Sequence, residues 1–356
     1  MVRLLNIKKN YTGTTGKLSA LKATRLSLFL ALALVVLVFN AFKQADGLKL
    51  YQLSGYAQGT TYNINYYHGS QAISKKQIDS ILVAIDSSLS IYKDYSLITT
   101  FNQSARGLKM DVHLQTVVEK SLAISKKSNG AFDITVYPLV NAWGFGLSKP
   151  TIPPSHAEIK KLLGNTGYQN IEIKGNELLK RKPQIQIDVN GIAQGYSVDL
   201  IADFLEKNGV RHYMAELGGE LRVKGKKPEN QSFKIGIEAV NDIDFAPLTK
   251  FIEIDSGAIT TSGNYRKFME LGTEQSNHII NPKTGYYQKN SLVSVTVYAP
   301  DAITADGYDN VLMNLGLEKS LSFLAKHKEL AAYFVFKKDG KIKDTCSVGF
   351  PKIKEF

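Results

Sequence analysis

Two acidic residues with helical spacing are the first candidates for chemistry in this chain. Asp306 and Asp309 lie three residues apart in the segment ADGYDN, where an apolar helical pattern begins. Side chains at i and i+3 project from the same side of a helical turn. Two such carboxylates repel each other, and a divalent cation such as Mg²⁺, which prefers oxygen ligands, removes that repulsion. The alternative is that both acids only favour the positive end of a helix dipole.

One histidine is a candidate general base. His278 opens the segment HIINPKTG, in which Pro282 and Gly285 predict a turn after an apolar pair. An imidazole at a strand edge can accept the proton of a hydroxyl nucleophile. The alternative is a histidine that only satisfies a hydrogen bond.

Two further segments could contact a flat or phosphorylated ligand. In AFDIT, Phe132 could stack on a ring that Asp133 hydrogen-bonds, or the pair could be a buried aromatic with a turn-forming acid. In DVNGIAQGY, residues 188–196, two glycines join a strand end to a helix start and expose backbone groups to a phosphate or a cation. This segment lacks the spacing of the P-loop and of GxGxxG, so a plain strand-to-helix turn is the alternative.

Several other chemistries have no support in the sequence. The chain contains no GxSxG elbow for a serine nucleophile and no closely spaced His or Cys pair for zinc. Its single cysteine, Cys346, excludes an intramolecular disulfide.

The elements that must position these residues follow from hydrophobic spacing. The alternation of Tyr62, Ile64 and Tyr66 predicts a strand, and Ser74 with Gln77 forms a capping-box pattern that starts a helix. Further helices are expected over residues 114–127, 197–207 and 318–327. Residues 185–191 are expected to form a strand that ends in a turn, and further strands are expected over residues 213–217, 233–239, 250–254, 292–299 and 331–336.

The order of these elements indicates the fold class. Residues 90–102 are expected to form a loop, and Pro150, Pro153 and Pro154 mark a connection that is expected to separate two sub-regions. Strands and helices are interspersed without a regular βαβ rhythm, so the sequence predicts an α+β fold.

The N-terminal part of the chain predicts a membrane anchor. The 356 residues carry a formal charge of +12, but six of the positive charges lie in residues 1–25, which contain no acid, and the remaining +6 is spread without a basic block. Nucleic-acid binding is therefore not expected. Residues 26–42 form an apolar run without a good cleavage site, which favours an uncleaved anchor over a cleaved export signal. The basic end is expected in the cytoplasm and the remainder outside it.

Taken in order, these segments resemble the ApbE family, whose members are FAD:protein FMN transferases. The chain matches the family's motif order from about residue 56 to residue 316. The matching motifs are GT at Gly59, LSIY ending at Tyr92, GAFD ending at Asp133, DVNGIAQGY at Asp188, GG at Gly218, TSG at Thr261, HIINPKTG at His278 and ADGYDN at Ala305. Each motif alone is weak, but eight in one order are specific. The resemblance implies a T-fold-related arrangement of mixed sheets with flanking helices over residues 50–356.

The resemblance also implies an activity. Such enzymes bind FAD and Mg²⁺, cleave the pyrophosphate and attach FMN through a phosphoester to a threonine of an exported protein. Carried over by motif, Mg²⁺ would be held by Gly191, Asp306, Asp309 and Asn310, and His278 would be the base for the threonine hydroxyl. FAD would contact Gln58, Tyr92, Ala131, Phe132, Asp133, Asp188, Gln194 and Ile280.

The resemblance further implies a location, and it has three departures. The acceptors would be exported subunits of redox complexes, of the NADH:quinone reductase or Rnf type, and the chain would cross the inner membrane once with its catalytic domain on the periplasmic side. Gln58 stands where many members have Met, Gln194 where several have Lys or Glu, and Asn310 where many have Thr. A FAD pyrophosphatase that releases FMN and AMP, or a FAD carrier without catalysis, are the alternatives.

Overall fold

The computed structural model describes residues 47–237, 250–264, 268–271 and 274–355. The basic segment 1–25 and the expected anchor 26–42 lie outside these residues. Within the described ranges, no helix is both long and apolar enough to cross a membrane. Residues 50–356 form one compact unit. The connection with Pro150, Pro153 and Pro154 runs within that unit, and the sub-regions expected on either side of it stay a prediction.

An antiparallel sheet of eight strands forms the centre of this unit. Its strand order is β1-β2-β6-β7-β10-β13-β14-β15. The pairing places Tyr62 opposite Leu217 and Ala258 opposite Ala299. The strands are β1 (Lys49–Ala57), β2 (Thr60–His68), β6 (His212–Leu217), β7 (Glu220–Lys224), β10 (Ser256–Gly263), β13 (Leu292–Ala299), β14 (Ala331–Lys338) and β15 (Lys341–Cys346). The predicted α+β class is confirmed.

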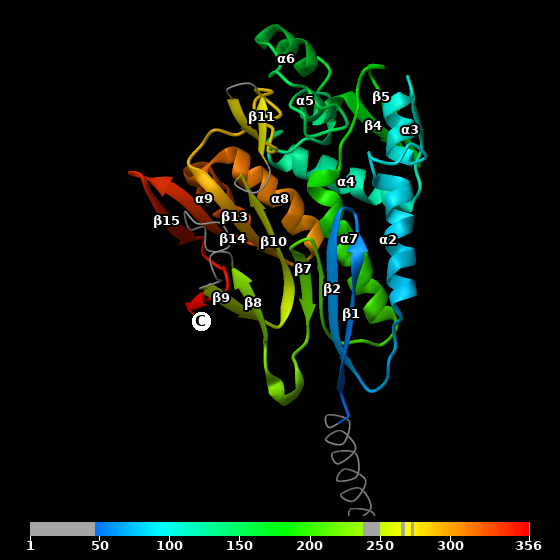
Figure 1. Ribbon diagram of the computed structural model, residues 1–356, viewed down its shortest axis with the longest axis vertical. Helices are drawn as coiled ribbons and strands as arrows, with labels where there is room; N and C mark the ends of the chain where they lie inside the picture. The colour runs from blue at the N-terminus through cyan, green and yellow to red at the C-terminus, as the bar shows by residue number, and fades with distance from the viewer. Residues whose placement is uncertain (1–46, 238–249, 265–267, 272–273, 356) are drawn as a thin grey trace, which may run out of the picture. The chain divides into compact units, whose positions relative to one another are not determined.

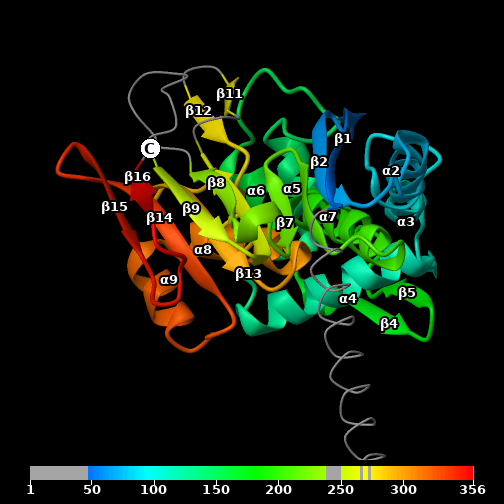
Figure 2. The ribbon, with the colours of Figure 1, turned by 90° about the horizontal axis from the view of Figure 1, so that it is seen from below.

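The two faces of the large sheet are covered differently. In β14, Ala332 and Phe334 point into the core under the helices, whereas Tyr333 and Val335 point into a second core on the other face. This alternation follows from the two-residue period of a strand. The second core lies between the large sheet and a small sheet of order β16-β9-β8 (Figure 2). Its strands are β8 (Phe233–Ile237), β9 (Lys250–Ile254) and β16 (Lys354–Glu355).

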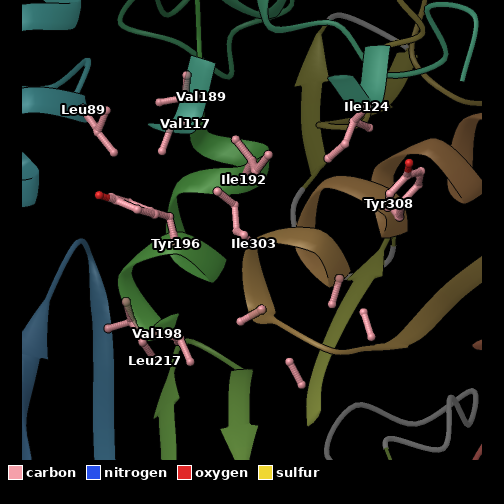
Figure 3. Packing of buried hydrophobic residues seen from close by; sticks show 14 of the residues in the cluster. Leu89, Val117, Ile124, Val189, Ile192, Tyr196, Val198, Leu217, Ile303 and Tyr308 are labelled. Atoms are coloured by element: carbon pink, nitrogen blue, oxygen red, sulfur yellow. The ribbon is translucent and has the colours of Figure 1, made fainter. Parts of the chain in front are cut away.

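Helices α7 and α8 pack side by side against β7, β10 and β13 (Figure 1). Helices α2 and α4 pack on α7, and α9 packs on α8 and β14. Figure 3 shows Ile192 and Tyr196 of α7 beside Ile303 of α8 in this core. The helices are α2 (Lys75–Leu89), α4 (Val112–Lys127), α7 (Asn190–Lys207), α8 (Ala302–Leu315) and α9 (Leu317–Leu324).

Smaller elements complete the unit. A three-stranded sheet has the order β3-β5-β4, and a two-stranded sheet pairs β11 with β12. A satellite core containing Trp143 and Ile280 joins α5 and α6 to the turn after β12. These elements are α3 (Leu97–Gln103), β3 (Gly107–Lys109), α5 (Tyr137–Ala142), α6 (His156–Leu163), β4 (Ile171–Lys174), β5 (Glu177–Lys180), β11 (Phe268–Leu271) and β12 (Glu274–Asn277), with 3₁₀ turns at Ile134–Val136, Tyr168–Asn170 and Pro228–Asn230.

Local signals predicted many of these elements and failed at others. The capping box forms, because the Ser74 N–H donates to Gln77 Oε1 at 2.9 Å at the start of α2. The expected loop over residues 90–102 is wrong in its second half. There α3 forms because the Ser96 hydroxyl accepts the Thr99 N–H at 3.1 Å and Phe101 is buried. The expected helix 318–327 ends three residues earlier, and β15 and β16 follow β14.

The expected strand over residues 185–191 is also wrong. The described residues 185–189 contain no strand, and α7 begins at Asn190, seven residues before the expected start. The side chain of Asn102 takes the place of a neighbouring strand at Ile187. Its Oδ1 accepts the Ile187 N–H at 2.7 Å and its Nδ2 donates to the Ile187 carbonyl at 2.9 Å. Buried backbone groups need such partners, and one side chain supplies two of them here.

Candidate active site

The start of α8 is capped by two aspartates from different elements. Asp199 of α7 accepts the N–H groups of Ala302 and Ile303 at 2.9 and 2.8 Å, and Asp301 accepts the N–H of Thr304 at 2.9 Å. These N–H groups have no partner within the helix. Arg222 Nη1 holds Asp199 at 2.9 Å. The acids that stabilise the helix start are therefore Asp199 and Asp301.

Asp306 and Asp309 lie further along α8 and are almost fully buried, with 4% and 2% of their surface exposed. The dipole interpretation of this pair is therefore wrong. Asp306 Oδ2 accepts the N–H of Gly195 at 2.8 Å, and Asp309 Oδ2 accepts the hydroxyl of Thr260 at 2.9 Å. The two side chains are thus fixed by α7 on one side and by β10 on the other.

The electrostatics of this pair are unfavourable for two anions. Burial raises the pKa of Asp306 and of Asp309. The negative charges of Asp306 and Glu220 raise the pKa of Asp309 further. Desolvation and like charge both disfavour the ionised form. A cation at this position would reverse both effects, since it supplies the missing positive charge.

Several oxygen atoms gather around the side chain of Asn310. Its Nδ2 lies 2.9 Å from Asp309 Oδ1, 3.2 Å from the carbonyl oxygen of Asp306 and 3.3 Å from that of Gly191. Gly191 has a non-helical ψ of 19° within α7. The structure therefore brings together all four residues that the sequence predicted for the metal. In the described ranges, no group of three or more His, Cys, Asp or Glu side chains is placed to hold a metal ion.

A second cluster forms around Asp188. Burial raises the pKa of this carboxyl to about 6, and its Oδ1 accepts the Asn190 N–H at 2.8 Å. Burial raises the pKa of Tyr92 and of Tyr137, and the charge of Asp188 raises both further, so both phenols lie near it. Tyr92 and Asp188 were predicted from the sequence, whereas Tyr137 was missed, because no local pattern marks it.

The AFDIT turn contacts both clusters, since Phe132 lies near Gly191 and the Ile134 carbonyl accepts the Asp188 N–H at 2.7 Å. The ring of Phe132 is buried near Gly191, and a Cβ added at Gly191 would lie 3.6 Å from its Cε2 atom. Both carboxylate oxygens of Asp133 are used within the turn, where Oδ1 accepts the Thr135 N–H at 2.9 Å and Oδ2 the Tyr168 N–H at 2.6 Å. Asp133 is thus a turn-forming acid here. Its direct contact with a ligand stays a prediction.

A small cavity of about 130 Å³ lies beside Ala131. The amide of Asn314 on α8 donates to the Ala131 carbonyl at 3.1 Å and to the Ile280 carbonyl at 3.5 Å. This side chain joins the AFDIT turn, α8 and the turn after His278. The lining of the cavity includes Ala131, Asn281, Lys283, Asn314, Leu315 and Lys319.

His278 follows β12, and its ring packs edge-on against Phe145 with 6.2 Å between the ring centroids. The predicted turn after it forms, with Gly285 at a φ of 75°. Trp143 Nε1 donates to the Gly285 carbonyl at 2.8 Å, and Asn281 Oδ1 accepts the Lys283 N–H at 2.9 Å. The turn is therefore held by a hydrogen bond within it and by one from Trp143.

Of the two glutamines that depart from the family pattern, Gln58 lies beside α7 and Gln194 lies within it. Gln58, at a φ of 51° between β1 and β2, donates from its Nε2 to the Ser197 hydroxyl at 3.0 Å. Gln194 lies against the glycine pair, because a Cβ at Gly218 would be 2.6 Å from its Nε2. Sequence reasoning missed Gly195 and Thr260 as partners of the aspartates. Thr260 is buried in β10. The alternation of inward and outward side chains along this strand was the available signal for it.

The chain is similar to known proteins over most of its length. Residues 58–334 match the model of the ApbE family. The FAD:protein FMN transferase of Vibrio cholerae is 35% identical over 327 residues, which cover 90% of this chain and 96% of that protein. The enzyme of the same name from Escherichia coli K12 is 35% identical over 289 residues, covering 79% and 81%.

Solved structures show the same fold. The flavin transferase ApbE from Vibrio cholerae superimposes with a TM-score of 0.77 at 33% identity, covering 85% of this chain and 98% of that one. The apo form of the Pseudomonas stutzeri flavinyl transferase gives a TM-score of 0.76 at 31% identity, covering 85% and 96%.

Proposed function

The chain belongs to the ApbE family and is a FAD:protein FMN transferase, and from this premise we propose that its reaction depends on Mg²⁺ and ends on a threonine hydroxyl of an exported protein. The observation that supports the metal is the gathering of Asp309 Oδ1 and the backbone carbonyl oxygens of Gly191 and Asp306 around one atom of Asn310. Carboxylate and carbonyl oxygens are the ligands that Mg²⁺ prefers.

These residues fit a magnesium ion chemically. Asp306 and Asp309 would supply the charge, and Gly191 and the amide oxygen of Asn310 would supply neutral oxygens. Bound Mg²⁺ would neutralise the charge that builds on the pyrophosphate oxygens of FAD.

The remaining residues would bind the flavin and handle the proton. Phe132 offers a ring for stacking, and Tyr92, Tyr137 and Asp188 offer hydrogen bonds beside it. Further contacts are proposed from Gln58, Ala131, Asp133, Gln194 and Ile280. These groups orient FAD so that the threonine oxygen faces the phosphorus of the FMN half.

His278 would accept the proton of the threonine hydroxyl. The new bond joins the threonine oxygen to the FMN phosphorus, and the bond to the bridging oxygen breaks. AMP departs with that bridging oxygen. The proton stays on the imidazole until it is released to water.

We further propose that residues 26–42 anchor the chain in the inner membrane, with the catalytic unit on the periplasmic side. The positive charges of residues 1–25 support this orientation. The acceptors would then be exported subunits of redox complexes, of the NADH:quinone reductase or Rnf type.

Mass spectrometry tests this proposal. The full chain is incubated with FAD, Mg²⁺ and an exported acceptor subunit, and the acceptor is expected to gain the mass of one FMN less one water on a threonine. Chelation of divalent cations is expected to abolish the gain, and an acceptor in which that threonine is alanine is the control. Release of free FMN in place of a modified acceptor would indicate a pyrophosphatase. Tight FAD binding without any product would indicate a carrier.

A further inference from the structure

We propose that Asn310 competes with the cation for the same oxygens. Its amide group must rotate by half a turn about χ2 before the metal can bind. This inference rests on the metal site of the proposed function and adds a control of its affinity. The group that would control this affinity is the side-chain amide of Asn310.

The contacts of Asn310 carry the argument. Its Nδ2 lies within 2.9–3.3 Å of Asp309 Oδ1 and of the carbonyl oxygens of Asp306 and Gly191. An amide nitrogen has only two hydrogens, but three acceptor oxygens surround this one. Such a concentration of acceptors around one positively polarised group is the environment of a cation. The Nδ2 atom of Asn310 therefore lies at the position that we propose for the cation.

The two ends of an amide have opposite roles. Nδ2 donates hydrogen bonds, whereas Oδ1 is a neutral ligand of the kind that hard cations accept. A half turn about χ2 exchanges them and converts Asn310 from a competitor into a ligand. If the inward Nδ2 is favoured about tenfold, the apparent affinity for the cation is lowered about tenfold, because only the turned state is competent.

Other residues at this position would compete less for these oxygens or not at all. A threonine hydroxyl has one hydrogen and can act as donor to only one of these oxygens, and an aspartate has none. Asn310→Thr is therefore expected to bind Mg²⁺ about tenfold more tightly than the wild type. Asn310→Asp also adds a negative charge beside Asp306 and Asp309, so it is expected to be the least stable without Mg²⁺ and to gain most from it.

The test uses the full-length chain and two measurements that need no catalysis. Isothermal titration calorimetry gives the Mg²⁺ affinity, and thermal unfolding in EDTA and in saturating Mg²⁺ gives the stability gained from the metal. The matched control is Asn314→Thr, one turn further along α8, because the amide of Asn314 donates only to backbone carbonyls. This control is expected to leave the Mg²⁺ affinity unchanged.

The outcomes separate this inference from the metal site itself. Tighter Mg²⁺ binding and a lower melting temperature in EDTA for Asn310→Thr support it. Failure of that variant to fold in EDTA, with normal folding in Mg²⁺, is the same result in its extreme form. Equal affinity and equal stability in EDTA for the wild type and Asn310→Thr would overturn the role of Asn310 while leaving the metal site intact. Absence of Mg²⁺ binding by the wild type and both Asn310 variants would overturn both.

Discussion

Replacing Gly195 by alanine tests whether the close crossing of α7 and α8 positions the site. Gly195 lies where the two helices approach, and its N–H donates to Asp306. Helix propensity alone predicts that alanine in a helix interior stabilises the protein by about 1 kcal/mol relative to glycine. The geometry predicts the opposite sign.

The magnitude follows from the neighbours of the added methyl group. A Cβ at residue 195 would lie 2.3 Å from the carbonyl oxygen of Ala302 and 2.7 Å from the Cβ of Asp306. Ordinary contacts begin near 3.4 Å, so the helices must separate by about 1 Å. Overpacking of this kind costs about 1–3 kcal/mol. After the propensity gain, a net loss of up to about 2 kcal/mol in the free energy of unfolding is expected. A displacement of about 1 Å at a catalytic group lowers the rate by about 100-fold.

Gly307→Ala is the matched control, because it is also a mid-helix glycine at this crossing. Its added Cβ would meet the Cδ1 atoms of Ile124 and Ile192 at 2.4 and 3.2 Å, which are the flexible ends of side chains and can rotate away. Urea unfolding and the initial rate of FMN transfer are measured for both variants. If Gly195→Ala were more stable than the wild type and equally active, the close-crossing argument would be refuted.

Two further predictions concern proton transfer and pH. His278→Gln is expected to lower the rate of FMN transfer about 10²–10⁴-fold while FAD binding, measured by titration, is unchanged. Loss of FAD binding would contradict a role as base. For Asp188, a folded-state pKa of about 6 lies above the unfolded value of about 3.9, so ionisation should reduce the wild type's stability as the pH rises between these values. Asp188→Asn should lack this fall, and parallel urea-unfolding profiles from about pH 4 to pH 7 would exclude the effect.

The sequence singled out candidate site residues that lie together in the fold, but it did not predict how several of them are held. The i, i+3 spacing of Asp306 and Asp309 correctly placed both on one helix, and the four proposed metal residues do lie together. The same reasoning expected a strand over residues 185–191. It failed there because an asparagine side chain, that of Asn102, supplies the hydrogen bonds that a neighbouring strand would supply.

The sequence by itself determined the features that depend on neighbours along the chain. The capping box at Ser74, the alternation in β2 and the turn at Gly285 are all local, and each formed as predicted. The motif order also sufficed to indicate the family, because many weak local signals add up when their order is fixed.

Only the tertiary structure decided which distant groups surround the two aspartates. The N–H of Gly195 reaches Asp306 across 111 residues, and Asp199 caps α8 from α7 across 103. No local pattern encodes such a partner, because the contact exists only once α7 and α8 have packed against the sheet. The burial that raises the pKa of Asp306 and Asp309 arises in the same way. The i, i+3 spacing in the sequence therefore placed the two carboxylates on one side of the helix. The packing of the helices against the sheet buried them, and this burial is what disfavours their ionised forms without a nearby positive charge.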